Sequence, residues 1–471
     1  MKNPLLRILF LPSFVLLIAL SGTGCKKTAS TTTEETVIPV LVTNGTIINV
    51  TTTTAQSGGT ITNFGFAAIT ANGVCYSSTN STPTTADSKT TDALQLQGIG
   101  NYAYSSNITG LTPNTTYYVR AYAINGIGTG YGSVVKFTTS SSLTAVTSTV
   151  STFAGNGTAG NVDGSGTGAQ FNNPAGLSVD SKGNVYVSDT YNNTIREITP
   201  GGTVTTIAGT GTLGYVDGPA ATAQFYSPQG SAFDTQGNLY VADAGNNVIR
   251  KITPAGVVST YSGNGNPGFV DGSTAANIEF NDPTDVAFDA AGNLYVSDRG
   301  NNLIRKITPA GVVSSLAGVP IFPNAGYIDA TDQLAEFNQP NGLVLDASNN
   351  VYVADQANSA IRKITTPGGV VTTVAGSTTQ KTLLNLPSAI AIDATGNLYF
   401  TDETGRVLEY TTGNIIYTLA GTANVSGYTD GPGATALFSN PQAIAVDASG
   451  NIYVADKNNN CIRKIVVTLT Q

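Results

Sequence analysis

Aspartate is the chemically capable residue that recurs most regularly in this sequence. Two series of Asp return once in each of six similar segments, and the stretch "NVYVSDTYNNTIREI" at residues 184–198 contains a member of one series. Carboxylates at fixed positions can serve general acid–base chemistry or hold Ca²⁺, or they can cap turns. The first series is Asp180, Asp234, Asp289, Asp346, Asp393 and Asp447, and the second is Asp189, Asp243, Asp298, Asp355, Asp402 and Asp456.

The remaining composition excludes several classes of chemistry. None of the 471 residues is histidine, which removes Ser-His-Asp and Cys-His nucleophile activation and His-ligated zinc. The net charge of −8 and the absence of a basic patch argue against a nucleic-acid partner. Cys75 and Cys461 lie in different segments without metal-ligand spacing, so we predict two separate small hydrophobic residues rather than a functional pair. We predict no bound cofactor or metal.

The N-terminus has the pattern of an export signal. Lys2 and Arg7 form a basic start, an apolar run covers residues 5–20, and "SGTGCKK" follows. A Cys directly after small residues resembles the lipobox of bacterial lipoproteins, although Gly22 stands where that motif has an apolar residue. The resemblance implies a signal peptide over 1–24 and lipidation of Cys25. Ordinary secretion with an incidental Cys is the alternative.

Two segments follow the predicted anchor. Residues 25–36 are rich in Thr and read as a tether. Residues 37–140 alternate short β-rich runs with turns, which predicts an antiparallel sandwich of about seven strands. Its stretch "LTPNTTYYVRAYAINGIGTGYG" resembles the end of a fibronectin type III domain, with Tyr117 at the tyrosine corner. The resemblance implies a spacer or docking module.

Residues 146–471 contain six copies of one unit. A proline precedes the first strand of each copy, at Pro174, Pro228, Pro283, Pro340, Pro387 and Pro441. Each copy reads as four short antiparallel strands without a helix, the pattern of a propeller blade. The last copy lacks its fourth strand, and a spare copy of that strand, "VSTFAG", stands at residues 150–155. We therefore expect the spare strand to complete the sixth blade and close the ring.

The repeated motif resembles the NHL repeat. The matching residues are a Pro-x-Gly/Ala start, a "D-x-x-G-N-[LVI]-Y-V-[AS]-D" core and an "N-x-[IV]-R" end. The fold class is thus predicted to be all-β, a six-bladed NHL β-propeller preceded by a small fibronectin III-like sandwich. Relatives in this family include binding modules and enzymes, and the zinc-dependent amidating lyases use histidines that this chain lacks.

A comparison among the six copies separates scaffold from site. A residue that every copy keeps serves the fold, whereas a residue that binds one ligand need not recur. We therefore interpret both Asp series as caps of their turns. In five copies a Phe closes the loop between units and is expected to anchor it in the core: Phe171, Phe225, Phe280, Phe337 and Phe438.

The long loops between units and the turns between the second and third strands share one face, which we expect to carry function. One candidate set is Tyr215, Phe269, Tyr327 and Tyr428, whose rings either stack on a ligand or tuck under their own loops. The other is Tyr191, Arg299, Gln356, Glu403 and Lys457, which differ between copies either as a ligand-specific rim or as ordinary surface variation.

These observations predict a non-catalytic binding module of the bacterial envelope. The architecture resembles outer-membrane lipoproteins of Bacteroidota-type bacteria, and it implies attachment through an N-terminal lipid with a glycan or protein as ligand outside the membrane. Whether the chain faces the periplasm or the cell surface stays open. One alternative is a His-free, Ca²⁺-dependent lactonase or lyase, which needs at least three converging carboxylates or carbonyls. The other is a structural part of envelope assembly.

Overall fold

The computed structural model describes residues 37–93, 101–140, 145–274, 277–320, 325–376 and 384–470. The predicted signal peptide, Cys25, the Thr-rich tether and most of the short loop after Gly376 lie outside these ranges. Within them the chain forms β-strands joined by turns and single 3-10 turns, which confirms the all-β prediction. No helix in the described ranges is long and apolar enough to cross a membrane.

The described part of residues 145–470 forms six antiparallel sheets, numbered here by the order of their first strands in the chain. Sheets one to three are β12 (Gly176–Val179), β13 (Val185–Asp189), β14 (Thr194–Ile198) and β15 (Thr203–Ala208); β17 (Pro228–Phe233), β18 (Leu239–Asp243), β19 (Val248–Ile252) and β20 (Val257–Ser262); and β21 (Pro283–Phe288), β22 (Leu294–Asp298), β23 (Leu303–Ile307) and β24 (Val313–Ala317). Sheets four to six are β25 (Pro340–Leu345), β26 (Val351–Asp355), β27 (Ala360–Ile364) and β28 (Val371–Gly376); β29 (Pro387–Ile392), β30 (Leu398–Asp402), β31 (Arg406–Tyr410) and β32 (Ile415–Ala420); and β34 (Pro441–Val446), β35 (Ile452–Asp456), β36 (Cys461–Thr470) and β10 (Ala145–Ala154). Two-residue strands β11 (Gly164–Ser165), β16 (Gly218–Pro219) and β33 (Gly431–Pro432) extend the outer edges of sheets one, two and six.

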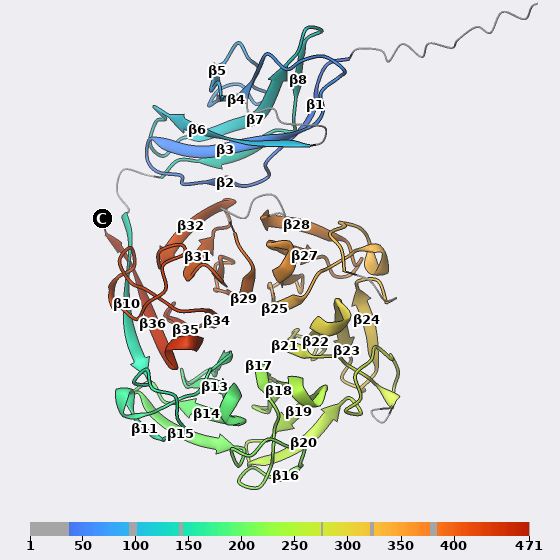
Figure 1. Cartoon of the computed structure of the whole chain (residues 1–471), viewed down its shortest axis with the longest axis vertical. Coiled ribbons are helices and arrows are strands. Elements are labelled where there is room, and N and C mark those ends of the chain that lie inside the picture. Colours follow the sequence, from blue (N-terminus) through green and yellow to red (C-terminus); the bar gives the residue numbers. More distant parts are fainter. Residues whose placement is uncertain are drawn as a thin grey trace, which may run out of the picture.

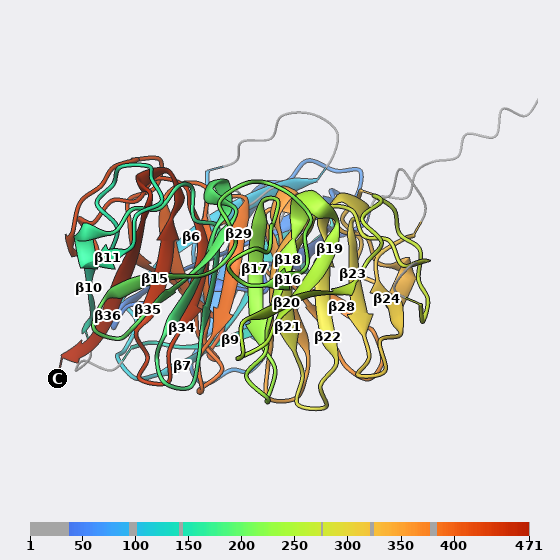
Figure 2. The ribbon, with the colours of Figure 1, turned by 90° about the horizontal axis from the view of Figure 1, so that it is seen from below.

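The six sheets surround one axis (Figure 1). Each inner strand contacts the inner strands of both neighbouring sheets, and β34 contacts β12, so the ring is closed at its centre. Seen from the side, the strands stand next to one another and their connections lie at two opposite faces (Figure 2). Apolar side chains from adjacent sheets fill the space between them, and the five Phe residues that close the long loops are fully buried there, as expected.

The strand β10 joins the two ends of the ring. It lies antiparallel to β36, with Thr152 opposite Arg463 and Ala145 opposite Thr470 (Figure 1). A second contact crosses the same junction, because the backbone N–H of Asn173 in sheet one donates to Oδ1 of Asn460 in sheet six at 3.0 Å. The sheet edge of β36 is thereby covered by a strand from the start of the ring.

The turn between the first two strands of each sheet explains the first Asp series. In sheet two, Oδ1 of Asp234 accepts the backbone N–H groups of Gln236 and Asn238, both at 2.9 Å, and Oδ2 accepts the Asn238 amide at 2.7 Å. Gly237 takes φ +80°, a conformation that glycine adopts without strain. The other five turns repeat these bonds, so each Asp closes its own hairpin.

The N-terminal unit consists of two packed sheets. One contains β1 (Val40–Thr43), β2 (Ile47–Ile48), β3 (Thr54–Asn63) and β6 (Tyr102–Thr109), and the other contains β4 (Ala71–Ser77), β5 (Ser88–Lys89), β7 (Thr116–Ile124), β8 (Thr129–Tyr131) and β9 (Val135–Thr138). Ile47 is fully buried, and β2 pairs in parallel with β32 of sheet five, Ile47 opposite Ile415. Thr46 also donates to the Val374 carbonyl of sheet four at 3.2 Å. The N-terminal unit is therefore docked on the ring by continuous β-pairing (Figure 1).

Candidate functional site

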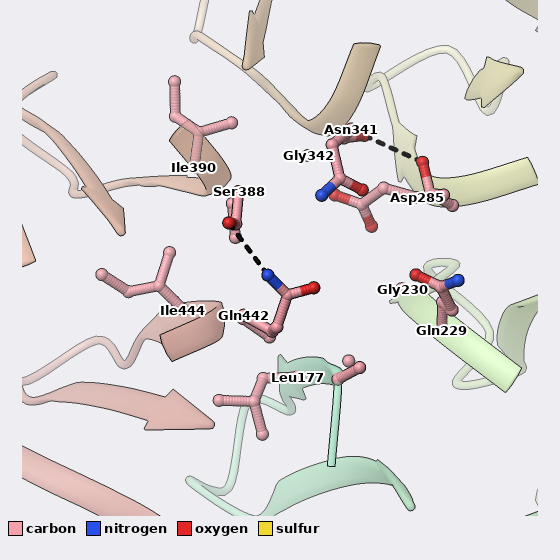
Figure 3. A pocket seen from close by; sticks show the side chains of 15 residues that line it. Leu177, Gln229, Gly230, Asp285, Asn341, Gly342, Ser388, Ile390, Gln442 and Ile444 are labelled. Carbon is pink, nitrogen blue, oxygen red and sulfur yellow. Dashed lines mark hydrogen bonds between the residues drawn. The ribbon is translucent and has the colours of Figure 1, made fainter. Parts of the chain in front are cut away.

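The site begins at the start of the six inner strands. The residue after each strand-opening proline points toward the axis, and five of the six are polar: Gln229, Thr284, Asn341, Ser388 and Gln442, with Ala175 as the sixth (Figure 3). The next position is Gly in three sheets, because the inner strands approach closely there. A Cβ on Gly176 would lie 2.1 Å from the Gln229 carbonyl oxygen. Amide and hydroxyl groups thus form a polar ring around the channel.

A cavity of about 310 Å³ opens above this ring. Its walls come from the turns between the second and third strands, which are single 3-10 turns such as η2 (Thr190–Asn192), η5 (Arg299–Asn301), η7 (Gln356–Asn358) and η8 (Lys457–Asn459). Each of these turns ends at a residue in the left-handed region, for example Asn193 with φ 52°. The sequence-predicted residues Tyr191, Arg299, Gln356, Glu403 and Lys457 all line this one cavity.

Hydrogen bonds connect three of these side chains along one wall. The Arg299 guanidinium pairs with Asp282 at 3.1 Å and donates to Oε1 of Gln339 at 3.0 Å and of Gln356 at 3.4 Å. The Gln356 amide in turn donates to Glu403 at 3.4 Å. Gln356 is buried, whereas Tyr191 is 60% exposed. The wall therefore combines an ordered polar network with an accessible aromatic ring.

Lys457 stands apart from that network. Its ammonium group makes no hydrogen bond or ion pair with any described residue. Burial and the nearby positive charge of Arg299 lower the pKa of Lys457, while Glu403 acts in the opposite direction. The cavity thus holds an unpaired cation whose charge the protein only partly compensates.

The channel below the cavity holds a carboxylate that the sequence analysis missed. Asp285 of β21 stands where the other inner strands have Gly or Ala. Its oxygens accept the N–H groups of Val286 and of Leu343 on the next sheet, both at 2.9 Å. Burial raises its pKa to about 7, against the lowering effect of these two N–H groups, and no ion pair joins it to a cation among the described residues. Asp285 therefore links sheets three and four at the channel.

The second candidate set does not gather at the cavity. Tyr215, Phe269 and Tyr428 are each 44% exposed, but they lie in different loops over the outer strands. The hydroxyls of Tyr215, Tyr327 and Tyr428 bond Thr260, Thr373 and Thr152 of outer strands at 3.0–3.1 Å. Their rings also lie over buried arginines at 5.0–5.3 Å. The three tyrosine rings are thus each held within their own sheet, and none of the four residues lines the central cavity.

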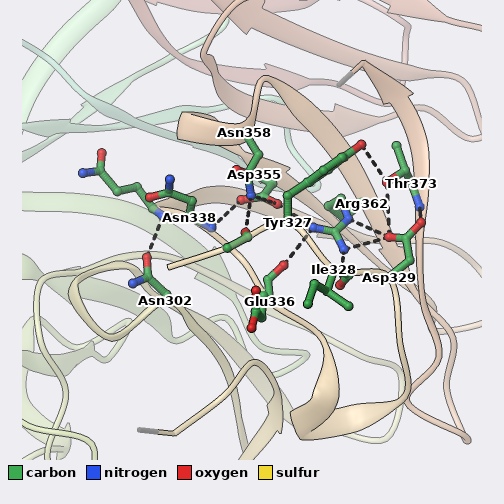
Figure 4. Close-up of polar contacts among 12 residues, drawn as sticks. Asn302, Tyr327, Ile328, Asp329, Glu336, Asn338, Asp355, Asn358, Arg362 and Thr373 are labelled. Carbon is green, nitrogen blue, oxygen red and sulfur yellow. Dashed lines mark hydrogen bonds and ion pairs between the residues drawn. The ribbon is translucent and has the colours of Figure 1, made fainter. Parts of the chain in front are cut away.

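The second Asp series forms a buried network, shown for sheet four in Figure 4. Asp355 is fully buried and accepts Arg362 at 2.7 Å, the Asn358 amide at 2.8 Å and the Asn338 N–H at 2.8 Å. Burial raises the pKa of Asp355 to about 6, against the lowering effect of Arg362. Arg362 also binds the loop carboxylate of Asp329 at 2.7 Å.

The same network recurs in all sheets but the fifth. Five arginines are fully buried against the Asp of their own sheet: Arg196, Arg250, Arg305, Arg362 and Arg463. In sheet five, Leu408 takes the place of this arginine, and Arg406, the first residue of β31, pairs with Asp402 instead. The network joins turn, loop and strand, which is a structural use of the carboxylates.

Other possible reactive groups are also buried or dispersed. Cys75 and Cys461 lie in β4 and β36, both fully buried, and burial raises the pKa of each thiol. Within the described ranges no three His, Cys, Asp or Glu residues cluster so that they could hold a metal ion.

Comparison with known proteins agrees with this architecture. A model of the NHL repeat matches residues 171–198, 280–307, 337–364 and 438–465, which fall in sheets one, three, four and six. The structure of a Bacteroides thetaiotaomicron protein of unknown function aligns over 91% of this chain and 98% of its own, with a TM-score of 0.53 and 18% identity. The ring therefore has the fold of a β-propeller, and four of its six sheets carry NHL repeats.

Two further proteins are similar to this chain, one in structure and one in sequence. The structure of an auxiliary nutrient binding protein from B. thetaiotaomicron aligns with this chain at a TM-score of 0.52 and 15% identity. The alignment again covers 91% of this chain and 98% of that protein. The Arabidopsis thaliana chloroplastic protein SUPPRESSOR OF QUENCHING 1 is 30% identical over 317 residues, 64% of this chain. That match spans only 26% of the plant protein.

Proposed function

We propose that this NHL propeller is a non-catalytic binding module of the bacterial envelope that holds the end of a glycan in its central cavity. The observation that carries the proposal is the convergence of five rim side chains and four polar inner-strand side chains, those of Gln229, Thr284, Asn341 and Gln442, on one cavity of about 310 Å³. That volume is at the lower end of the roughly 300–1,000 Å³ range of ligand pockets. Amides and hydroxyls arranged in a ring suit a ligand with several hydroxyl groups.

A glycan fits this cavity better than a protein does. A stable protein interface buries about 800 Å² on each partner and has apolar anchors at its centre. The centre of this face is instead a small concavity lined by Gln229, Gln442 and Asn341. A single sugar residue at a chain end matches its size and its polarity.

The proposal includes the architecture and location expected from the sequence. We take the six sheets as six blades closed by β10, and the N-terminal unit as a fibronectin III-like sandwich. The Thr112 N–H donates to the Tyr117 hydroxyl at 3.0 Å, which supports a tyrosine corner. The envelope location and lipid attachment at Cys25 follow from the N-terminal sequence, and the Bacteroides nutrient binding protein of the same fold supports this class. Incorporation of a labelled fatty acid that is lost in Cys25→Ala tests the attachment.

The enzymatic alternative requires three carboxylates or carbonyls that converge on an ion. Among the described residues that line the cavity, Glu403 is the carboxylate, and Asp282 is paired with the lining residue Arg299. The buried Asp network lies within separate sheets rather than at the axis. We therefore favour binding over catalysis.

A glycan array followed by calorimetry tests the proposal with a matched pair of variants. Tyr191→Ala removes an exposed ring from the cavity, and Tyr215→Ala removes an exposed ring from the outer loops. Binding should weaken about five-fold or more in Tyr191→Ala, because the packing of an aromatic ring on a ligand contributes on the order of 1 kcal/mol or more. Binding should be unchanged in Tyr215→Ala. Failure of every glycan to bind, or equal loss in both variants, contradicts the proposal.

A further inference from the structure

Two cations face the central cavity from different sheets. Arg299 is on the η5 turn of sheet three, and Lys457 is on the η8 turn of sheet six, which lies opposite across the ring. They are close enough for the charge of Arg299 to lower the pKa of Lys457. Like charges that meet in a partly buried cavity are unfavourable unless an anion lies between them.

The described residues provide little negative charge for the Lys457 ammonium. Among the described residues, Asp282 is 40% exposed and already pairs with Arg299 at 3.1 Å. Glu403 is exposed and accepts the Gln356 amide, and it forms no ion pair with Lys457. The deeper Asp285 is occupied by two backbone N–H groups of the channel wall. The Lys457 ammonium therefore keeps all three of its N–H donors for a ligand.

We infer that the cavity takes an acidic sugar, a hexuronic acid residue, whose carboxylate lies between Lys457 and Arg299. The inference rests on the proposed function and specifies its ligand. The polar ring of Gln229, Thr284 and Gln442 faces the sugar hydroxyls, and the Tyr191 ring lies at the cavity mouth. A carboxylate gives the Lys457 ammonium the ion-pair partner that it does not have among the described residues, and ring hydroxyls match the amide and hydroxyl lining that a simple anion would leave unused.

The test compares acidic and neutral sugars that differ at one carbon. Galacturonic acid is paired with galactose, and glucuronic acid with glucose, and binding to the full chain is measured by ligand-observed NMR. At least one acid should bind more than ten-fold tighter than its neutral partner. Its affinity should fall with added NaCl, because salt screens the ion pair.

Two variants report on the charges without touching the Asp network. Lys457→Met keeps the length of the side chain and removes its charge, and it should weaken acid binding about ten- to hundred-fold, the usual value of a charge-assisted hydrogen bond. Glu403→Gln removes the negative charge of a carboxylate that lines the cavity, and it should tighten acid binding several-fold. The readout is the ratio of acid affinity to neutral-sugar affinity, which should fall in Lys457→Met and rise in Glu403→Gln.

The outcomes separate this inference from the function on which it rests. Equal binding of acid and neutral sugars, or unchanged acid binding in Lys457→Met, overturns the acidic ligand and leaves glycan binding intact. Absence of binding to both sugars and to every glycan of the array overturns both.

Discussion

The buried pair Asp355–Arg362 allows a sharp test of the propeller scaffold. Substitution Arg362→Leu leaves the carboxylate of Asp355 buried with only the Asn358 amide and the Asn338 N–H as donors. Both side chains of the pair are fully buried, so water cannot replace the guanidinium. Removal of one partner of a buried ion pair costs about 3–5 kcal/mol. The second partner of Arg362, Asp329, is 45% exposed and can be solvated, so it adds little to this cost.

The measurement is urea unfolding followed by circular dichroism and tyrosine fluorescence. Arg299→Leu is the matched control, because the Arg299–Asp282 pair is 32% and 40% exposed and its loss should cost at most about 1 kcal/mol. The double variant Asp355→Asn/Arg362→Leu should regain at least half of the lost free energy, since no buried charge is left unpaired. A loss for Arg362→Leu no larger than that of the control would refute the reasoning.

The pH dependence of Arg362→Leu gives a second readout. The folded-state pKa of Asp355 is already raised to about 6, and loss of the arginine raises it further. A carboxyl whose folded pKa exceeds its unfolded value stabilises the fold at low pH, and that stability is lost as the pH rises through the folded pKa. The penalty of Arg362→Leu should therefore be smaller at pH 5 than at pH 8.

Three further predictions concern the channel, the outer loops and the ring closure. The pKa of Asp285 is about 7 in the folded state and ordinary in the unfolded state, so ionisation of Asp285 destabilises the fold as the pH rises. The melting temperature of the wild type minus that of Asp285→Ala should therefore decrease from pH 5 to pH 8. A constant difference contradicts the raised pKa of Asp285. Tyr327→Phe removes the bond to Thr373 and should cost about 1 kcal/mol in urea unfolding without a change in glycan affinity, and an altered affinity would place this ring in the site. Val150→Asp puts a carboxylate at a position of β10 that is 1% exposed, and it should lower the unfolding midpoint in urea more than Val466→Asp on the 42%-exposed surface of β36; equal effects would show that β10 does not close the ring.

The sequence was most informative where structure depends on nearby residues. The turn of Asp234 is closed by residues two and four positions later, so its role can be read from one repeat. The NHL pattern and the all-β class follow from six such repeats. Tyr191, Arg299 and Lys457 could be grouped because each lies one or two residues after the Asp that ends the second strand of its sheet. The turns that carry them line the central cavity.

The sequence did not show how far from the ring axis each loop residue lies. Tyr215 and Tyr428 occupy equivalent loop positions, as the rim residues do, but these positions lie over the outer strands and keep the rings apart. Asp285 and Gln442 were missed because they lie at the start of a strand and carry no turn signal. Variation among the six residues after the strand-opening prolines was the available indication. The pairing of β2 with β32 involves only Ile47 and Ile48, too few residues to give a periodic pattern.

The pairing of β10 with β36 has a consequence for the order of biosynthesis. The bond from Thr147 to the Thr468 carbonyl joins residues 321 positions apart. A ribosome must therefore translate almost the whole ring before its first strand meets its partner, and contacts of such long range form slowly. Until then, β10 is an unpaired strand that neighbouring chains can capture. A chaperone that shields this early segment would protect the nascent protein during that interval.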